Sequence, residues 1–394
     1  MSRRVAMLAP FGLRPKATLA QRMLPLAAAM NARGWTCSIV APPLSEPAGA
    51  GRVELIDGVR IEHVNGPRSP GPFGMLETSA RMVVTAMRGR PDLLHVFKPK
   101  GYSGLAALLA HRLAPRLPQV QDTDDWEGWG GWNELLPYPV WMKHVFAWQE
   151  RSLPRAANAV TVASRTLQTQ VWGFGVDPAR VLYLPNGVPE RAPVLPTRAA
   201  ARAQLGLGAE PVVLLYTRFW EYPLSYILEL LVVLRARRPD ARLLVIGDGE
   251  AGEAAELLRR AQRAGLEASL DVRGWSDRVT IQAAMAAADA AVVPFADTLM
   301  NRAKCSVKLL ELLQAGVPVA ASRVGQAAEY IRDGESGLLV EPGGIALADG
   351  VMRLLADKRW AQALGETAQH DVAERFGWSH LAVALHDIYT ALSR

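Results

Sequence analysis

The sequence predicts an α/β protein made of two Rossmann-like, doubly wound domains that face each other across a cleft. Short apolar runs rich in Val, Ile and Leu alternate with longer segments of helical period, as strands and crossover helices do in a parallel sheet. Residues 185–196 carry four prolines and no periodicity, and the alternating pattern starts again after them. The length of 394 residues also favours two or three domains over one.

The first domain is expected at residues 1–188. Its predicted strands are 5–10, 36–43, 59–64, 92–97, 118–123, 159–164 and 181–186. Predicted helices between them include 19–34, 78–89 and 104–114. Most of these strands are short runs rich in Val, Ile and Leu, which is typical of a parallel sheet covered by helices.

A linker at residues 189–196 leads to a second domain at 197–377. The strands expected there are 211–218, 241–249, 269–274, 289–295, 318–322 and 337–342, and the helices are 225–238, 251–265, 280–288 and 307–316. The last stretch, 378–394, has apolar residues at helical spacing beyond any remaining strand. It either closes the second domain or packs back across the junction.

The positive charge is concentrated in the first half of the chain. The whole chain has a net charge of +6, but residues 1–188 hold 21 Lys and Arg against 13 Asp and Glu, whereas residues 189–394 hold 23 against 25. No zinc finger or aromatic RNA-binding signature accompanies this charge, so nucleic acid is not expected as a partner. An anionic lipid surface and a phosphate-bearing substrate both fit, and scattered solvated arginines are an equal alternative.

The small number of cysteines and the short lengths of the apolar segments indicate a cytoplasmic protein. Cys37 and Cys305 are the only cysteines, so a disulfide framework or a cysteine metal cluster is excluded. The apolar stretch before Pro10 is too short for a secretory signal, and no window of eighteen residues lacks charge.

Ligand sites are expected where strands end, because open α/β sheets bind ligands there. After the first strand, Gly12, Arg14 and Lys16 precede a helix whose free N–H groups favour an anion. A phosphate site is one interpretation of this loop, and an ordinary strand-to-helix turn is the other.

In the second half, cations and glycines follow three strands. Arg218 ends one strand, Gly247 begins a glycine turn after another, and Lys304 and Lys308 flank the start of the helix at 307–316. Such a cluster of cations and helix N–H groups can neutralise a diphosphate without a metal. Glu311 on the otherwise apolar face of that helix needs a partner, which could be the hydroxyls of a ribose or Lys308 one turn earlier.

Four blocks of the sequence carry a family resemblance: residues 164–188 (SRTLQTQVWGFGVDPARVLYLPNGV), 241–250 (ARLLVIGDGE), 289–295 (DAAVVPF) and 307–342. Together they resemble the family 4 glycosyltransferases, which have the GT-B fold. The resemblance implies a nucleotide-sugar donor held mainly by the second domain, an acceptor held mainly by the first, and metal-independent transfer with retention. It also implies that Arg218 binds the diphosphate, the amides around Ser306 and Val307 bind phosphate, and Glu311 binds ribose.

Three positions depart from the family pattern. Pro223 stands where a lysine usually follows the phosphate arginine, and Ala303 replaces the first of two glutamates, which normally touches the donor sugar. In the first domain, DTDDW has Asp124 in place of the family's acceptor-side histidine. Asp124 is therefore either the residue that orients the acceptor hydroxyl or a helix N-cap.

Two other motifs have competing interpretations. Residues 122–124 spell DTD, a triplet that binds divalent metal in another glycosyltransferase fold, but it lies in the wrong half for donor binding and we expect no metal site. His95, on an apolar strand, is expected to be a core residue.

Five of the eleven tryptophans lie within residues 126–148, near Lys143, Arg151 and Arg155. They suit either a membrane interface or the packing of a long helix on the sheet.

The expected function is retaining, metal-independent transfer of a hexosyl group from a nucleoside diphosphate sugar to a hydroxyl acceptor, with no further cofactor. The catalytic candidates are Arg218, Lys304, Lys308 and Asp124. A lipid-linked or glycolipid acceptor, with peripheral contact to an anionic membrane, would account for the basic first half. A nucleotide-sugar epimerase and a catalytically silent sugar-binding protein are the alternatives.

Overall fold

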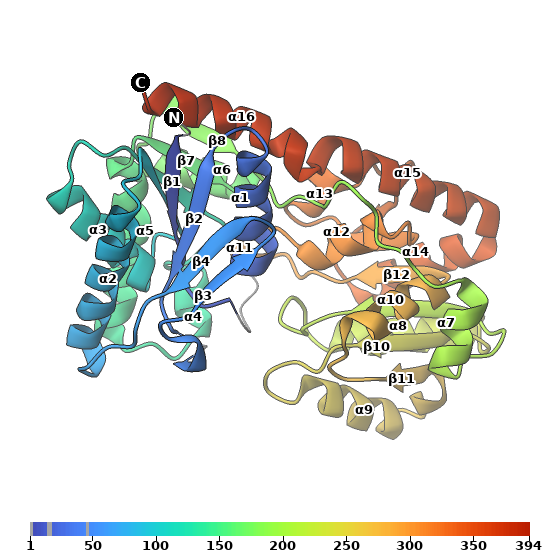
Figure 1. The fold of residues 1–394 in the computed structure, drawn as a ribbon. Helices are drawn as coiled ribbons and strands as arrows, with labels where there is room; N and C mark the ends of the chain where they lie inside the picture. The colour runs from blue at the N-terminus through green and yellow to red at the C-terminus, as the bar shows by residue number, and fades with distance from the viewer. Residues whose placement is uncertain (1–2, 14–17, 45–46) are drawn as a thin grey trace. The chain divides into compact units, whose positions relative to one another are not determined.

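The computed structural model describes residues 3–13, 18–44 and 47–394, and it forms two compact units (Figure 1). The first unit comprises Met1–Gly187, Ala303–Cys305 and Gly377–Arg394. The second comprises Val188–Arg302 and Ser306–Phe376. Each unit is built around its own sheet.

The first unit contains an eight-stranded sheet in the order β3-β4-β2-β1-β5-β6-β7-β8. The strands are β1 Arg4–Leu8, β2 Thr36–Ala41, β3 Val53–Ile56, β4 Val59–His63, β5 Leu93–Phe97, β6 Gln119–Thr123, β7 Ala159–Val162 and β8 Val181–Tyr183. All neighbours pair in parallel except β3 and β4. The expectation of a doubly wound parallel sheet is therefore confirmed.

Helices cover both faces of this sheet (Figure 1). They are η1 Leu19–Met23, α1 Leu24–Asn31, α2 Gly71–Arg88, α3 Gly101–Leu113, α4 Trp132–Leu135, α5 Val140–Ala156, α6 Arg165–Gly173 and α16 Trp378–Leu392. The side chains of β1 point alternately to the two faces of the sheet, as successive side chains of a strand do. Val5 and Met7 join the core with α1 and α16, whereas Ala6 and Leu8 join the core with α2, α3 and α5.

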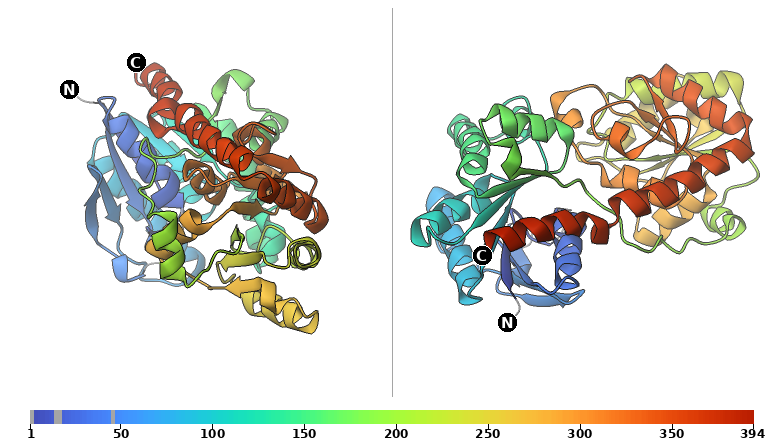
Figure 2. Two further views of the ribbon diagram at one scale, coloured as in Figure 1. Left: turned by 90° about the vertical axis from the view of Figure 1, so that its right-hand side faces the viewer. Right: turned by 90° about the horizontal axis from the view of Figure 1, so that it is seen from above.

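The C-terminal helix α16 is part of the first unit. It lies beside α1, as the red and blue helices show in Figure 2. Its Tyr389 is fully buried and contacts the rings of Trp35 and His95 edge-on. The side chains of α16 thus complete the core on one face of the first sheet.

The second unit contains a six-stranded, entirely parallel sheet in the order β11-β10-β9-β12-β13-β14. Its strands are β9 Val212–Tyr216, β10 Arg242–Ile246, β11 Leu270–Val272, β12 Ala290–Val293, β13 Val319–Ser322 and β14 Leu338–Val340. The remaining helices are α7 Arg198–Leu205, α8 Ser225–Arg237, α9 Glu253–Arg263, α10 Arg278–Ala287, α11 Leu299–Ala303, α12 Val307–Gln314, α13 Ala327–Tyr330, α14 Gly344–Ala356 and α15 Lys358–Phe376. Leucines of α8 and α14 fill the core against β9 and β10.

Two of the differences from the sequence prediction have local causes. The helix expected over 19–34 begins as the π-helical turn η1, in which the Leu24 amide donates to Leu19 O five residues back. Pro25 follows directly and has no N–H to donate, so the regular ladder is interrupted there. The sequence prediction also missed β3, which pairs with β4 through a turn at Asp57 and Gly58, both at positive φ.

Within the described ranges, no helix has the length and apolar character needed to cross a membrane.

Candidate functional site

Two candidate donor-binding residues follow adjacent strands of the second sheet. Arg218 comes two residues after β9, and Gly247 comes directly after β10. Gly247 has φ +132°, and a Cβ there would lie only 1.9 Å from Thr217 O, so this close approach requires glycine. The two loops are therefore packed directly against each other.

The loop that carries Arg218 is held in a strained conformation. Phe219 is buried yet has φ +65°, which is unusual for a bulky residue. Its amide donates to Thr217 Oγ1 at 2.8 Å, and the same hydroxyl hydrogen-bonds Tyr222 Oη at 2.8 Å. This network leaves the Arg218 side chain half exposed, with Nη2 3.8 Å from the Glu221 carboxylate.

The candidate phosphate-binding helix α12 begins at Val307, directly after Ser306, in the second unit. Ser306 caps it by accepting the Leu309 amide at 3.3 Å. The first N–H groups of a helix have no carbonyl partner within it, so the Val307 and Lys308 amides, which precede the capped Leu309 amide, can face an anion. Lys308 in the first turn lies with its ammonium 3.8 Å from the centroid of the Tyr216 ring.

Glu311 is mostly buried one turn further along α12, and it accepts a hydrogen bond from the Tyr216 hydroxyl. Burial raises the pKa of Glu311, while Lys308, the Tyr216 hydroxyl and Arg278 oppose that rise. Glu311 is therefore not solvent-facing, while Lys308 interacts with its carboxylate as the alternative of a pair one turn apart expected. Arg278, at the start of α10, adds a cation near this carboxylate that the sequence analysis did not select.

Pro223 and Ala303, the two donor-side positions that depart from the family pattern, have different surroundings. Pro223 is exposed just before α8, where its fixed φ suits the approach to a helix. Ala303 is fully buried, so a glutamate at this position would need extra room.

Lys304 belongs to the short segment Ala303–Cys305, which is assigned to the first unit. Asn186 holds this segment, because its Nδ2 donates to Cys305 O at 2.9 Å and its backbone amide donates to Cys305 Sγ at 3.0 Å. Lys304 thus falls in a different unit from Arg218 and Lys308, with which the sequence analysis grouped it.

Among the other first-unit candidates, the buried Gly12 amide donates to Leu44 O at 3.0 Å. Arg14 and Lys16 of the same loop lie outside the described residues. The phosphate site proposed from this loop therefore stays a prediction.

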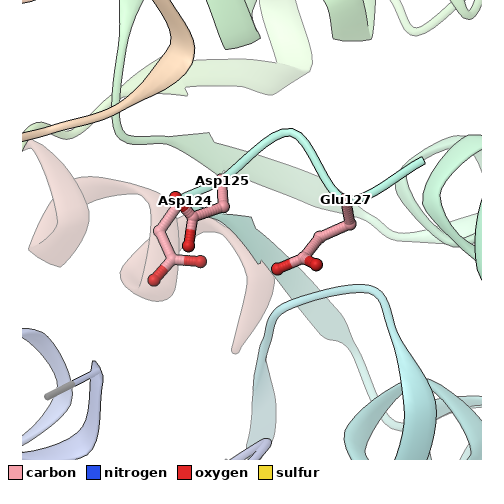
Figure 3. Close-up of side chains that lie close together, drawn as sticks. All are labelled: Asp124, Asp125 and Glu127. Carbon is pink, nitrogen blue, oxygen red and sulfur yellow. The ribbon is translucent and has the colours of Figure 1, made fainter. Parts of the chain in front are cut away.

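Asp124 follows β6 in a cluster of acidic residues with Asp125 and Glu127 (Figure 3). Burial raises the pKa of Asp124 to about 6, and the neighbouring carboxylates add to the rise while Lys98 opposes it. Lys98 and Lys100 outweigh the effect of burial on Glu127 and lower its pKa to about 2. Asp124 does not cap a helix, since Gly131 is the N-cap of the next helix, α4.

The DTD triplet is divided between two ion pairs. Asp122 is fully buried and binds Arg22 of η1, while Asp124 lies 2.9 Å from the Lys98 ammonium. His95 is a core residue as expected, with Nδ1 2.6 Å from Tyr389 Oη and Nε2 3.2 Å from Thr161 Oγ1. Both aspartates therefore already have cationic partners within the protein.

Sequence reasoning missed the partners that complete these groups: Arg22, Lys98, Lys100, Tyr216 and Arg278. Two signals were available. Lys98 directly follows β5, at a strand end where open α/β sheets bind ligands, and Arg22 is a lone charge among apolar helical residues. Nothing local marks Tyr216 as the partner of a glutamate 95 positions away.

The tryptophan-rich segment exposes much of its aromatic surface. Trp141 and Trp148 on α5 are each 52% exposed, while α5 packs inward through Phe146 and Leu153. Arg151 and Arg155 are also exposed, three and seven residues after Trp148, and so share its side of the helix. Inward packing therefore does not account for these two tryptophans.

Both halves of the chain match models of glycosyltransferase families. Residues 18–187 match the model described as "Glycosyl transferase 4-like domain", and residues 210–357 match "Glycosyl transferases group 1". The chain is similar over 400 residues, 99% of its length and 97% of the relative, to a phosphatidyl-myo-inositol mannosyltransferase of Mycobacterium tuberculosis, with 24% identity.

Shorter matches have higher identity. The chain is 30% identical over 234 residues, 58% of its length, to a GDP-mannose-dependent alpha-(1-6)-phosphatidylinositol monomannoside mannosyltransferase of Mycolicibacterium smegmatis. That match spans only 61% of the relative.

Solved structures share the fold. A sucrose-phosphate synthase of Thermosynechococcus elongatus matches with a TM-score of 0.73 and 22% identity, covering 99% of both chains. Anabaena Alr3699/HepE in complex with UDP-glucose matches with a TM-score of 0.74 and 20% identity, covering 98% of this chain and 99% of that one. These likenesses bear out the GT-B architecture expected from the sequence.

Proposed function

The chain belongs to the group 1 glycosyltransferases, and from that premise we propose that it transfers a hexosyl group from a nucleoside diphosphate hexose to a hydroxyl acceptor, with retention and without a metal. The observation that carries the proposal is the arrangement at the carboxyl end of the second sheet. There the Arg218 loop, the capped start of α12 and the Tyr216–Glu311 pair offer groups for a diphosphate and a ribose.

The donor side suits electrostatic catalysis. During transfer the bond from the anomeric carbon to the diphosphate oxygen breaks, and the acceptor oxygen bonds to the same face of that carbon. The acceptor proton passes to the departing diphosphate. Arg218, Lys308 and the first amides of α12 would stabilise the charge that develops on this leaving group.

The acceptor would be bound by the first unit, with Asp124 as the residue that orients its hydroxyl. Asp124 is buried beside Lys98, so its position is fixed before any acceptor arrives. Fixed orientation of a reacting group is one of the larger contributions to catalysis.

A lipid-linked acceptor is supported by the surface of the first unit. The exposed tryptophans of α5 and the nearby arginines combine an apolar surface with positive charge, as membrane-surface helices do. Two relatives are named for transfer to phosphatidylinositol-type acceptors. We therefore propose a glycolipid acceptor at an anionic membrane surface.

The test begins with a thermal-shift screen of the purified protein against GDP-, UDP-, ADP- and dTDP-sugars. GDP-mannose is included because one relative is named as dependent on it. The stabilising donor is then incubated with phosphatidylinositol vesicles, and transfer of labelled hexose to lipid is followed. Stabilisation and a labelled lipid product are expected.

Other outcomes identify the alternatives. An isomerised sugar nucleotide in the absence of acceptor would identify an epimerase. Nucleotide binding with neither transfer nor donor hydrolysis would favour a silent binding protein, for which Pro223 and Ala303 are the motivation.

A further inference from the structure

Asp124, Asp125 and Glu127 form a compact group of three carboxylates on the loop after β6 (Figure 3). One oxygen from each lies within 4.8 Å of the other two. Carboxylate oxygens gathered this closely repel one another unless a cation lies among them.

The Lys98 ammonium is that cation. Its Nζ lies 2.9 Å from Asp124, 2.5 Å from Asp125 and 3.0 Å from Glu127. The Lys98 side chain is only 4% exposed, so water screens these contacts only weakly. A single ammonium therefore contacts all three carboxylates, as a bound metal would.

The backbone around Lys98 is fixed in an uncommon conformation. Lys98 has φ +58°, and its amide donates to Asp122 O at 3.0 Å. Its own carbonyl accepts the Ser103 hydroxyl and the Lys100 amide, each at 2.8 Å. Such strain persists only where the surroundings over-determine the geometry.

A second lysine, Lys100, also pairs with one of these carboxylates, but its ammonium does not lie among all three. Lys100 Nζ lies 2.6 Å from Glu127, and near the faces of Tyr138 and Phe146. Three carboxylates facing two ammonium groups leave one formal negative charge. Lys98 is the lysine that contacts Asp124.

We propose that the Lys98 ammonium is a built-in cation, which takes the place of a divalent metal among Asp124, Asp125 and Glu127 and positions the Asp124 carboxylate for the acceptor. Lys98 is then a positioning residue, and this part rests on the proposed function. The claim that Lys98 occupies the cation position does not rest on the proposed function. The positioning role and the cation position are therefore tested separately.

The first experiment titrates Mn²⁺ into wild type and Lys98→Ala, following free Mn²⁺ by electron paramagnetic resonance. Removing the ammonium opens a three-carboxylate site for a hard cation. We expect Lys98→Ala to bind Mn²⁺ at least about tenfold more tightly than wild type, and Asp125→Asn in that background to abolish the gain. A folded Lys98→Ala variant with no gain in affinity would overturn the proposal.

The wild-type titration stands alone if circular dichroism shows that Lys98→Ala does not fold. Mn²⁺ binding by wild type that Asp125→Asn abolishes would show that Lys98 does not occupy the cation position. Absence of such binding is the result expected.

The positioning role is tested by kinetics. Lys98→Met should lower kcat at least about tenfold with an unchanged KM for the donor, because only the acceptor side is disturbed. Lys358→Met, an exposed lysine on α15, is the matched control.

Mn²⁺ should restore part of the activity of Lys98→Ala. An unchanged kcat in Lys98→Met would overturn the positioning role of Lys98. If wild type transfers no sugar, the proposed function fails, while the Mn²⁺ titration still decides the cation position.

Discussion

The Arg22 guanidinium holds the Asp122 carboxylate through two hydrogen bonds, 2.9 Å from Nε to Oδ1 and 2.5 Å from Nη2 to Oδ2, inside the first unit. Arg22 also donates to Asn186 Oδ1 at 3.1 Å and Leu184 O at 2.9 Å. Because Asn186 binds Cys305, this fully buried pair connects η1 and β6 to the segment Ala303–Cys305.

Arg22→Met should destabilise the protein by about 3–5 kcal/mol, because it leaves Asp122 buried without its charge partner. Urea unfolding, followed by circular dichroism, measures the change. The matched control is Arg237→Met, which removes the exposed pair with Asp349 and should cost less than about 1 kcal/mol. Equal effects of the two substitutions would contradict the prediction.

His95 should make stability fall as the solution is acidified. Burial, with help from Arg22, lowers the pKa of His95 from 6.5 to about 4, although Asp122 opposes this. The unfolded chain therefore binds more protons than the folded protein between these values, and stability is lost as pH falls through that window. The shift corresponds to about 3 kcal/mol.

His95→Gln should remove this dependence, measured as the difference between variant and wild-type unfolding free energies from pH 4 to 7. His370→Gln, at an exposed histidine, should leave it intact. Parallel curves for wild type and His95→Gln would show that His95 does not titrate in this window.

The strands were predictable because a covered parallel sheet requires apolar residues on both faces of each strand. LLHVF of β5 and VVLLY of β9 are clear examples. The strand β3 was missed because it lies at an edge and its residues are only half buried or exposed, so its apolar pattern is weak. The Asp57-Gly58 turn was the usable signal.

The candidate site was predictable only as far as chain position could indicate it. Arg218 and Glu311 could be selected because each stands at a strand end or near a helix start. Lys98 in FKPKG has the sequence of a solvated loop, and its burial depends on carboxylates 26 to 29 residues further along. Such tertiary contacts leave no local periodicity.

Arg218→Ala should lower turnover on the order of a hundredfold or more, as does the loss of one preorganised donor at a developing charge. Steady-state transfer with the donor found by thermal shift is the measurement. Arg237→Ala, on the exposed side of α8, is the control. Normal turnover by purified Arg218→Ala would argue against a diphosphate leaving group at this loop.

Glu311→Ala should weaken binding of the nucleoside diphosphate by roughly 10- to 100-fold, since a hydrogen bond to a charged group is lost. Pyrophosphate has no ribose, so its affinity should not fall. Calorimetric titration of both ligands separates a ribose contact from a general loss of the site. Glu335→Ala, an exposed carboxylate, is the matched control.

The α5 surface should bind anionic lipid through both charge and aromatic insertion. Each arginine near the surface contributes about 1 kcal/mol, so Arg151→Gln with Arg155→Gln should weaken binding roughly 30-fold. Trp141→Ser with Trp148→Ser should weaken binding at high salt as well, because insertion is not screened. Trp172→Ser, on α6, should behave as wild type.

Sedimentation with neutral and with anionic vesicles, each at low and high salt, measures these effects. Equal and negligible pelleting of wild type in all four conditions would contradict the membrane assignment and favour a soluble acceptor.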